Sequence, residues 1–150
     1  GVYRRGNIIG KNANGSLLVD DFAHTPEEVA ETIRTLASFS DKVYAVYQPH
    51  GFGPLRKTYE QMAILLKEVM RKQDVFYLAD VYYEGGTTDM SIGSKFVADY
   101  FTSQGINCVY VQDRNEIPAM IKKESKANDS IVIMGARDKS LADYACSFKG

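Results

Sequence analysis

Apolar residues along this chain fall alternately into short runs typical of strands and longer stretches spaced as on one face of a helix. Near the start, apolar runs at 8–9 and 17–19 flank a turn that contains Asn14 and Gly15, and an Asn-Gly pair in that setting predicts a β-hairpin. Four later runs have the composition of buried strands, and they lie at 43–47, 75–78, 108–111 and 131–134.

Helical patterns fill the intervals between these runs. The first helix is predicted over 26–39, because Thr25 can cap it and Pro26 suits its first turn. Four more are predicted at 55–72, 91–103, 116–125 and 139–148. This alternation predicts a Rossmann-like α/β fold, with a mostly parallel sheet, helices on both faces and an opening β-hairpin. No repeat or linker interrupts it, so residues 1–150 are expected to form a single domain.

Composition and charge narrow the class of protein. The 18 basic and 19 acidic side chains leave no electrostatic excess that would hold a nucleic acid or an anionic membrane. Neither a spanning stretch of about 20 apolar residues nor a signal peptide is found. Cys108 and Cys146 form no CxxC pattern, which indicates reduced, buried thiols. We therefore expect a soluble, cytoplasmic protein.

Both histidines fall at predicted strand ends, where ligands bind in parallel α/β sheets. His24 lies in the segment at 20–26, Asp-Asp-Phe-Ala-His-Thr-Pro, after the strand at 17–19. His50 lies in a Gln-Pro-His-Gly turn after the strand at 43–47. Each imidazole either caps its loop through a backbone hydrogen bond or faces a ligand. The loop position favours the ligand role, because rigid scaffolds place binding groups on such loops.

Several standard sites are excluded by spacing. The histidines and cysteines lack the HxH, HExxH or CxxC patterns of metal sites, and no GxSxG motif marks a serine nucleophile. The phosphate loop GxxxxGK[ST] is absent, since Gly93-Ser94-Lys95 sits at a predicted helix start. The turn at 135–138 is too short for GxGxxG. We predict no metal site, and little binding of ATP or NAD by this chain alone.

Several segments, taken in order, resemble the C-terminal domain of the Mur ligases, and most closely the alanine-adding branch. The segments that carry this resemblance, spread over nearly the whole chain, are Tyr3-Arg4-Arg5, similar to the family's hinge motif; 20–26, similar to Asp-Asp-Tyr-Ala/Gly-His-x-Pro; Tyr47-Gln48-Pro49-His50, similar to Phe-Gln-Pro-His; Asp80-Val81-Tyr82; and Met134-Gly135-Ala136. Residues 1–6 are then expected to be the remnant of the hinge from a missing central ATPase domain.

The resemblance implies an ATP-dependent ligase of peptidoglycan biosynthesis. In such enzymes a separate N-terminal domain holds the UDP-N-acetylmuramate, and a central domain holds ATP and magnesium. ATP activates a sugar-linked carboxylate as an acyl phosphate, which the amine of an amino acid attacks. The C-terminal domain brings the amino acid and closes the ATP site, so the isolated domain is expected to be inactive.

The resemblance also implies roles for residues of this chain. Arg5 and Asp21 would lie at the ATP, while His24 and His50 would border the amino acid. No residue is assigned a definite catalytic role.

This chain departs from the branch where arginines are implied to hold the carboxylate of the amino acid. Gly51 and Pro54 stand at those positions, and neither can supply a guanidinium. Two alternatives stay open. Either Arg56 and Arg137 together replace the missing pair, or the protein is a ligase-like homologue with another amine substrate or none, such as a non-catalytic small-molecule-binding α/β module.

Overall fold

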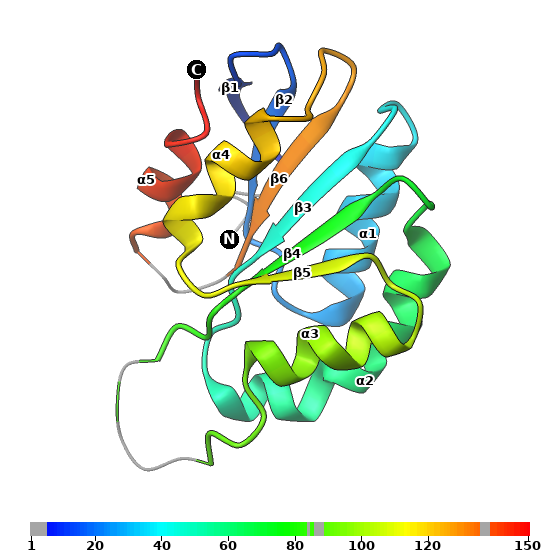
Figure 1. Ribbon diagram of the computed structural model, residues 1–150, viewed down its shortest axis with the longest axis vertical. Coiled ribbons are helices and arrows are strands. Elements are labelled where there is room, and N and C mark those ends of the chain that lie inside the picture. The colour runs from blue at the N-terminus through cyan, green and yellow to red at the C-terminus, as the bar shows by residue number, and fades with distance from the viewer. Residues whose placement is uncertain (1–5, 84, 86–88, 136–138) are drawn as a thin grey trace.

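The computed structural model describes residues 6–83, 85, 89–135 and 139–150. Within this part of the chain, six strands form one sheet in the order β1-β2-β6-β3-β4-β5 (Figure 1). The strands are β1 Asn7–Lys11, β2 Leu17–Asp21, β3 Val43–Tyr47, β4 Val75–Ala79, β5 Cys108–Val111 and β6 Ser130–Met134. Only the β1–β2 hairpin pairs are antiparallel among the strand pairs described. The predicted mostly parallel sheet with an opening hairpin is confirmed.

Helices cover both faces of this sheet, as predicted (Figure 1). On one face lie α1 Pro26–Ala37, α2 Phe52–Val69 and α3 Ser94–Ser103, and on the other lie α4 Ile117–Lys122 and α5 Leu141–Cys146. The strands serve both layers because successive side chains alternate between faces: Ala45 joins the α1–α3 core, while Tyr44 and Val46 join the α4–α5 core.

Helix boundaries differ from the predicted ones where loop contacts decide them. The second helix begins at Phe52 rather than at 55, because Gly51, with a φ of 86°, turns the chain into it. The third begins at Ser94 rather than at 91, where the buried Ser94 hydroxyl donates a 2.6 Å hydrogen bond to the carbonyl of Ala79. A 3₁₀ turn, Arg114–Glu116, precedes α4.

The two cysteines are free, but the expectation that both are buried is wrong. Cys146 is exposed, because the inward face of α5 is occupied by Leu141, Tyr144 and Ala145. Cys108 is partly buried, and this burial raises the pKa of its thiol to about 12, which keeps it protonated and unreactive.

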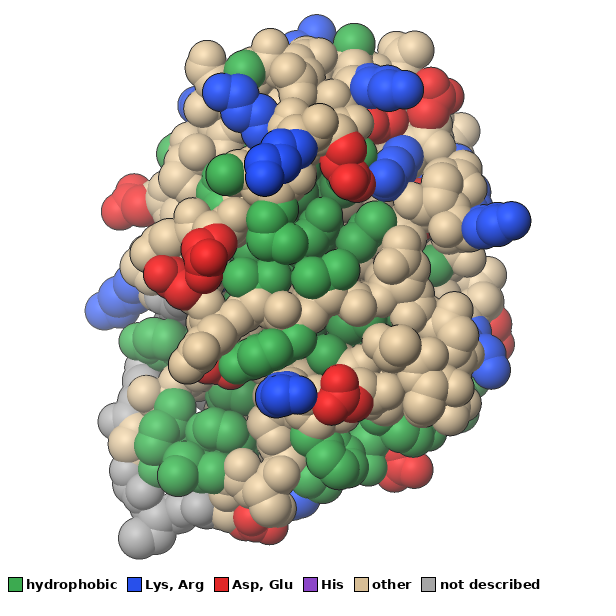
Figure 2. Space-filling view, viewed as in Figure 1, with side chains coloured by type: hydrophobic (Ala, Val, Ile, Leu, Met, Phe, Trp, Pro, Cys, Tyr) green, Lys and Arg blue, Asp and Glu red, His purple; other side chains and the backbone are tan. Residues whose placement is uncertain are grey.

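The face of the molecule in Figure 2 carries acidic as well as basic side chains, with groups of hydrophobic side chains between them. The mixture agrees with the formal net charge of −1. Among the described helices, none has the length and apolar character needed to span a bilayer.

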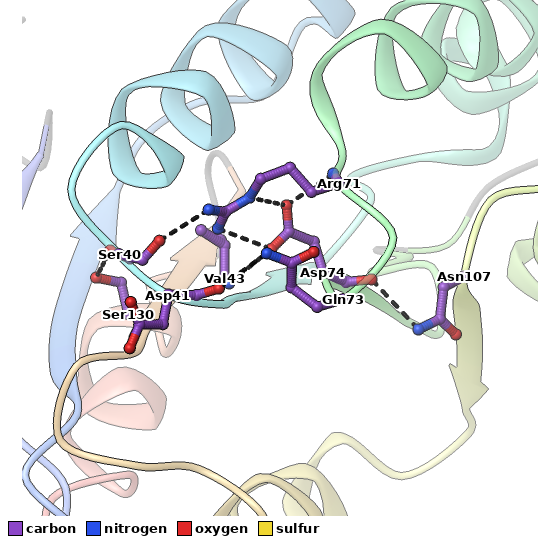
Figure 3. Close-up of polar contacts among 8 residues, drawn as sticks. All are labelled: Ser40, Asp41, Val43, Arg71, Gln73, Asp74, Asn107 and Ser130. Atoms are coloured by element: carbon purple, nitrogen blue, oxygen red, sulfur yellow. Dashed lines mark hydrogen bonds and ion pairs between the residues drawn. The ribbon is translucent and has the colours of Figure 1, made fainter.

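A buried polar network lies at the end of the sheet where the strands β3, β4 and β6 begin (Figure 3). The carboxylate of Asp74, 1% exposed, accepts hydrogen bonds from the backbone N–H groups of Val43 and Arg71, both at 2.9 Å. Its oxygens also lie 3.1 Å from Nε and from one terminal nitrogen of the Arg71 guanidinium, which donates in turn to the carbonyl of Ser40 at 2.9 Å. One carboxylate therefore joins the start of β3 to the turn before β4.

Replacement of Asp74 by alanine is expected to lower the free energy of unfolding by about 3 kcal/mol, because it leaves the N–H of Val43 without an acceptor and removes the partner of a half-buried guanidinium. Urea denaturation followed by circular dichroism measures the change. The matched control is Gln73→Ala, which removes one exposed hydrogen bond to Asp41 and should stay within about 0.5 kcal/mol of the unmodified protein. Equal effects of the two substitutions would contradict the prediction.

Candidate functional site

The turn that leaves β2 is organised by the carboxylate of Asp21. This side chain is 3% exposed, and its oxygens accept hydrogen bonds from the N–H groups of Ala23 and Gly6, each at 2.7 Å. The first bond closes an Asx turn after the strand. The second ties the segment before β1 to the same strand end. Asp21 thus fixes two chain segments at the carboxyl edge of the sheet.

A reciprocal capping box then starts α1. The hydroxyl of Thr25 accepts from the N–H of Glu28 at 3.2 Å, while Oε1 of Glu28 lies 3.3 Å from the N–H groups of both His24 and Thr25. Burial by itself would raise the pKa of the Glu28 carboxyl, but hydrogen bonds from the backbone of Thr25 and His24 outweigh it and lower that pKa. Glu28 is therefore a carboxylate at neutral pH.

His24 is held on two sides. Its Nδ1 lies 3.1 Å from the carbonyl oxygen of Phe22 and 3.4 Å from Oε1 of Glu28, and its side chain is 44% exposed. The hydroxyl of Tyr47, at the end of β3, donates to the carbonyl of His24 at 3.0 Å. Burial raises the pKa of Tyr47, which keeps this hydroxyl protonated as a donor. This hydrogen bond joins the loop after β2 to the end of β3.

His50 lies in the loop after β3, which is joined to the loop after β4. The N–H of Gly51 donates to the carbonyl of Tyr82 at 2.9 Å, and the N–H of Tyr82 donates to the carbonyl of Pro49 at 2.8 Å. The rings of His50 and Tyr82 lie with their centroids 5.2 Å apart and their planes tilted by 37°. Nδ1 of His50 is buried and has no hydrogen-bond partner among the described residues. Burial of a polar atom without a hydrogen-bond partner costs stability.

The two histidines line the same cavity, of about 220 Å³, between the first turns of α1 and α2. This volume is below the roughly 300–1,000 Å³ of sites for drug-sized ligands. The other residues that line it are Thr25, Pro26, Tyr47, Pro49, Pro54, Leu55 and Thr58. Apart from the histidines, this described lining contains no basic side chain and no carboxylate. A cavity of this size suits a small molecule.

The other predicted site residues lie elsewhere. Arg56 does not line this cavity, and its guanidinium instead lies 3.4 Å from the carbonyl of Asp89. Asp21 lines a separate cavity of about 390 Å³ between β1, β2 and α1. Arg5 and Arg137 fall outside the described residues. The structure brings His24 and His50 together and leaves Arg56 and Asp21 apart from them.

Sequence reasoning missed an arginine at this edge. The guanidinium of Arg114 donates to Oε1 of Gln48 at 2.8 Å and to the hydroxyl of Ser140 at 2.6 Å, and it lies 4.7 Å above the ring of Tyr144. Nε2 of Gln48 in turn donates to the carbonyl of Asp80 at 2.5 Å. These contacts join the loops after β3, β4, β5 and β6. Arg114 follows a predicted strand end closely in sequence, so the rule that singled out the histidines could have found it.

Gly135, directly after β6, permits the closest approach at this edge. Its φ is 149°, and a Cβ atom there would lie 2.9 Å from both the carbonyl oxygen of Gln48 and Cδ2 of Leu141. Any side chain at this position would push against the loop that carries His50. A glycine is therefore needed for the strand ends of β3 and β6 to stay adjacent.

Gly135→Ala is expected to lower the free energy of unfolding by roughly 2 kcal/mol, through overpacking and backbone strain together. The control, Gly105→Ala, also places a Cβ at a positive φ, 85°, but in open space. Its effect therefore measures the strain alone and should be smaller. Chemical denaturation of both variants provides the comparison, and equal losses would show that the contact with Gln48 and Leu141 contributes nothing.

No cluster of three or more metal-ligating side chains is present in the described part of the chain. The edge provides two imidazoles, one of them beside a carboxylate, around a small cavity at the carboxyl ends of parallel strands. Such groups can orient, protonate or deprotonate a small polar ligand.

Comparisons with known proteins point to one family. Residues 4–137 match the family described as Mur ligase, glutamate ligase domain. The chain is 30% identical over 141 residues to UDP-N-acetylmuramate–L-alanine ligase of Desulfitobacterium hafniense, and 33% identical over 139 residues to the enzyme of that name from Caldicellulosiruptor bescii. Each alignment covers 92% of this chain. The chain spans about 30% of the length of these relatives.

Solved structures share the fold. UDP-N-acetylmuramate–alanine ligase of Thermotoga maritima superposes with a TM-score of 0.67 at 24% identity, covering 99% of this chain and 29% of that one. A bifunctional folylpolyglutamate synthase/dihydrofolate synthase solved with manganese, AMPPNP and L-glutamate has a TM-score of 0.66 at 16% identity, covering 97% and 32% of the two chains. At these identities the structures support the α/β fold alone.

Proposed function

This chain belongs to the Mur ligase family through its glutamate ligase domain, and on that premise we propose that it is the amino-acid-binding C-terminal domain of an ATP-dependent ligase that joins an amino acid, with L-alanine the first candidate, to UDP-N-acetylmuramate in peptidoglycan biosynthesis. The relatives named for that reaction are about three times as long, so further domains of the same protein would supply the sugar nucleotide and ATP sites. The domain would act in the cytoplasm.

The observation that carries this proposal is the shared cavity of His24 and His50. Two imidazoles from different strand ends face a volume suited to one amino acid, at the edge where α/β sheets bind ligands. His24 is exposed enough to reach a ligand, and His50 lines the same cavity. Together they would hold the amine of the amino acid toward the activated carboxyl group.

ATP, when bound, would supply the phosphoryl group that activates the carboxylate. Asp21 is the one candidate for nucleotide contact among the described residues, and both of its oxygens already accept backbone N–H groups. Its geometry fits a structural tie better than a site for nucleotide or magnesium. The proposed contribution of the described residues is therefore to bind the amino acid.

A second candidate is a ligase of the same class that uses a different amine. The described cavity lining has no arginine or lysine to pair with the carboxylate of an amino acid. Gly51 has a φ of 86°, and a Cβ there would lie 3.3 Å from Cδ of Pro54, so an arginine at that position would be strained. An amine with no carboxylate beside it would need no such cation.

Phosphate release from ATP by the longer protein that carries this chain tests both candidates. With UDP-N-acetylmuramate present, L-alanine is expected to stimulate release more than glycine, L-serine, D-glutamate or ethylamine. His50→Ala should lower kcat/KM for the amino acid by about 10- to 100-fold, the equivalent of one hydrogen bond to a charged group. Gln73→Ala, at the opposite end of the sheet, serves as the control and should keep full activity.

The outcomes separate the candidates. Stimulation by ethylamine equal to that by L-alanine would favour the second candidate. Phosphate release that no amine increases would contradict both.

A further inference from the structure

The hydrogen bonds of His24 determine which of its ring nitrogens carries a proton. Nδ1 faces the carbonyl oxygen of Phe22 and the carboxylate oxygen of Glu28, at 3.1 and 3.4 Å. Both groups can only accept hydrogen bonds, so Nδ1 must be the donor. In the neutral imidazole the proton therefore resides on Nδ1, and Nε2 presents a lone pair.

Nε2 is available to a ligand. No described residue bonds to it, the side chain is 44% exposed, and His24 lines the cavity that it shares with His50. A free lone pair at the wall of a binding cavity is the arrangement that a proton acceptor requires.

Glu28 has the properties of a second group in such a pair. It is ionised at neutral pH, since hydrogen bonds from Thr25 and His24 overcome the effect of burial and lower its pKa. A negative charge 3.4 Å from Nδ1 stabilises the imidazolium that forms when Nε2 takes a proton. The other titratable groups around His24 are Tyr47, which bonds to its carbonyl and stays neutral, and His50 across the cavity. Glu28 is thus the anion that faces His24 from the elements described.

From this geometry we propose that Glu28 is a positioning residue that holds His24 in the Nδ1–H form, so that Nε2 of His24 accepts the proton of the incoming ammonium group. The proposal deepens the proposed function and rests on it for the identity of the substrate. In this step an N–H bond of the ammonium breaks, its proton moves to Nε2, and the electron pair stays on the amine nitrogen. His24 becomes an imidazolium beside the Glu28 carboxylate, and the neutral amine gains the lone pair needed to attack a carboxyl carbon.

This role differs from the capping role of the same side chain. A glutamine serves in a capping box as well as a glutamate does, because its amide oxygen accepts the same backbone N–H groups. The charge is needed only for His24. Glu28→Gln therefore keeps the helix start and removes the electrostatic part, while Glu31→Gln removes a charge from the exposed side of the same helix as a matched control.

Two measurements test the proposal. Nitrogen-15 NMR of the unmodified 150-residue chain at a pH where His24 is neutral is expected to show Nδ1 protonated and Nε2 unprotonated. In the longer protein, Glu28→Gln should lower kcat about tenfold, as for groups that support a reacting side chain from behind, with KM for the amino acid and the urea midpoint of unfolding changed little. Glu31→Gln should leave kcat and the ring protonation unchanged.

Four results would overturn the proposal. An Nε2–H tautomer in the unmodified chain overturns the proposal whatever the activity of the longer protein. Unaltered kcat in Glu28→Gln, with an active parent enzyme, overturns it while the proposed function stands. A lower urea midpoint of unfolding in Glu28→Gln, accompanying the lower kcat, would assign Glu28 to capping alone and overturn the proposal as well. An inactive parent enzyme contradicts the proposed function, and the base role of His24 falls with it.

Discussion

The insertion of β6 between β2 and β3 is the constraint on which the site depends. In the parallel register of these strands, Asp21 pairs with Met134 and Met134 with Tyr47, so the three strands end level with one another. Neighbouring strands lie about 4.8 Å apart, which sets the ends of β2 and β3 about 10 Å apart. The loops that carry His24 and His50 therefore leave the sheet at a separation that one small molecule can bridge. Gly135, directly after β6, has no side chain to push against the loop that carries His50.

The two ends of the sheet differ in how their polar groups are used. At the end where β3 and β4 begin, Asp74 and Arg71 satisfy one another and nearby backbone groups inside the protein (Figure 3). At the carboxyl end, by contrast, the lone pair of Nε2 in His24 and the buried Nδ1 of His50 have no partner among the described residues. The hydroxyl of Tyr44, near the start of β3, is likewise buried without a partner among the described residues, so a missing partner does not by itself mark one end. What distinguishes the carboxyl end is the cavity that both histidines line.

The fold was predictable because its signals are local. Apolar runs, the Asn-Gly turn and the cap at Thr25 each act within a few residues, and the strands and helices occur close to where these signals place them. The pairing of His24 with His50 also followed, since parallel strand ends meet at one edge. The sequence could not predict where the side chain of Arg56 points, because its contact with Asp89 depends on how a later loop folds back. Cys146 was misjudged because helix rotation, rather than residue type, decides its exposure.

The segment from Asp20 to Pro26 shows how a structural signature can contain a chemical one. Read alone, Thr25 and Glu28 form a capping box, which accounts for the glutamate without any function. The structure adds that the same oxygen which accepts the N–H of His24 also lies beside its ring nitrogen. Because the cap fixes the glutamate in place, its charge reaches the imidazole at no further cost in side-chain entropy. A helix start of this kind is therefore also a rigid mount for a histidine and its counter-charge.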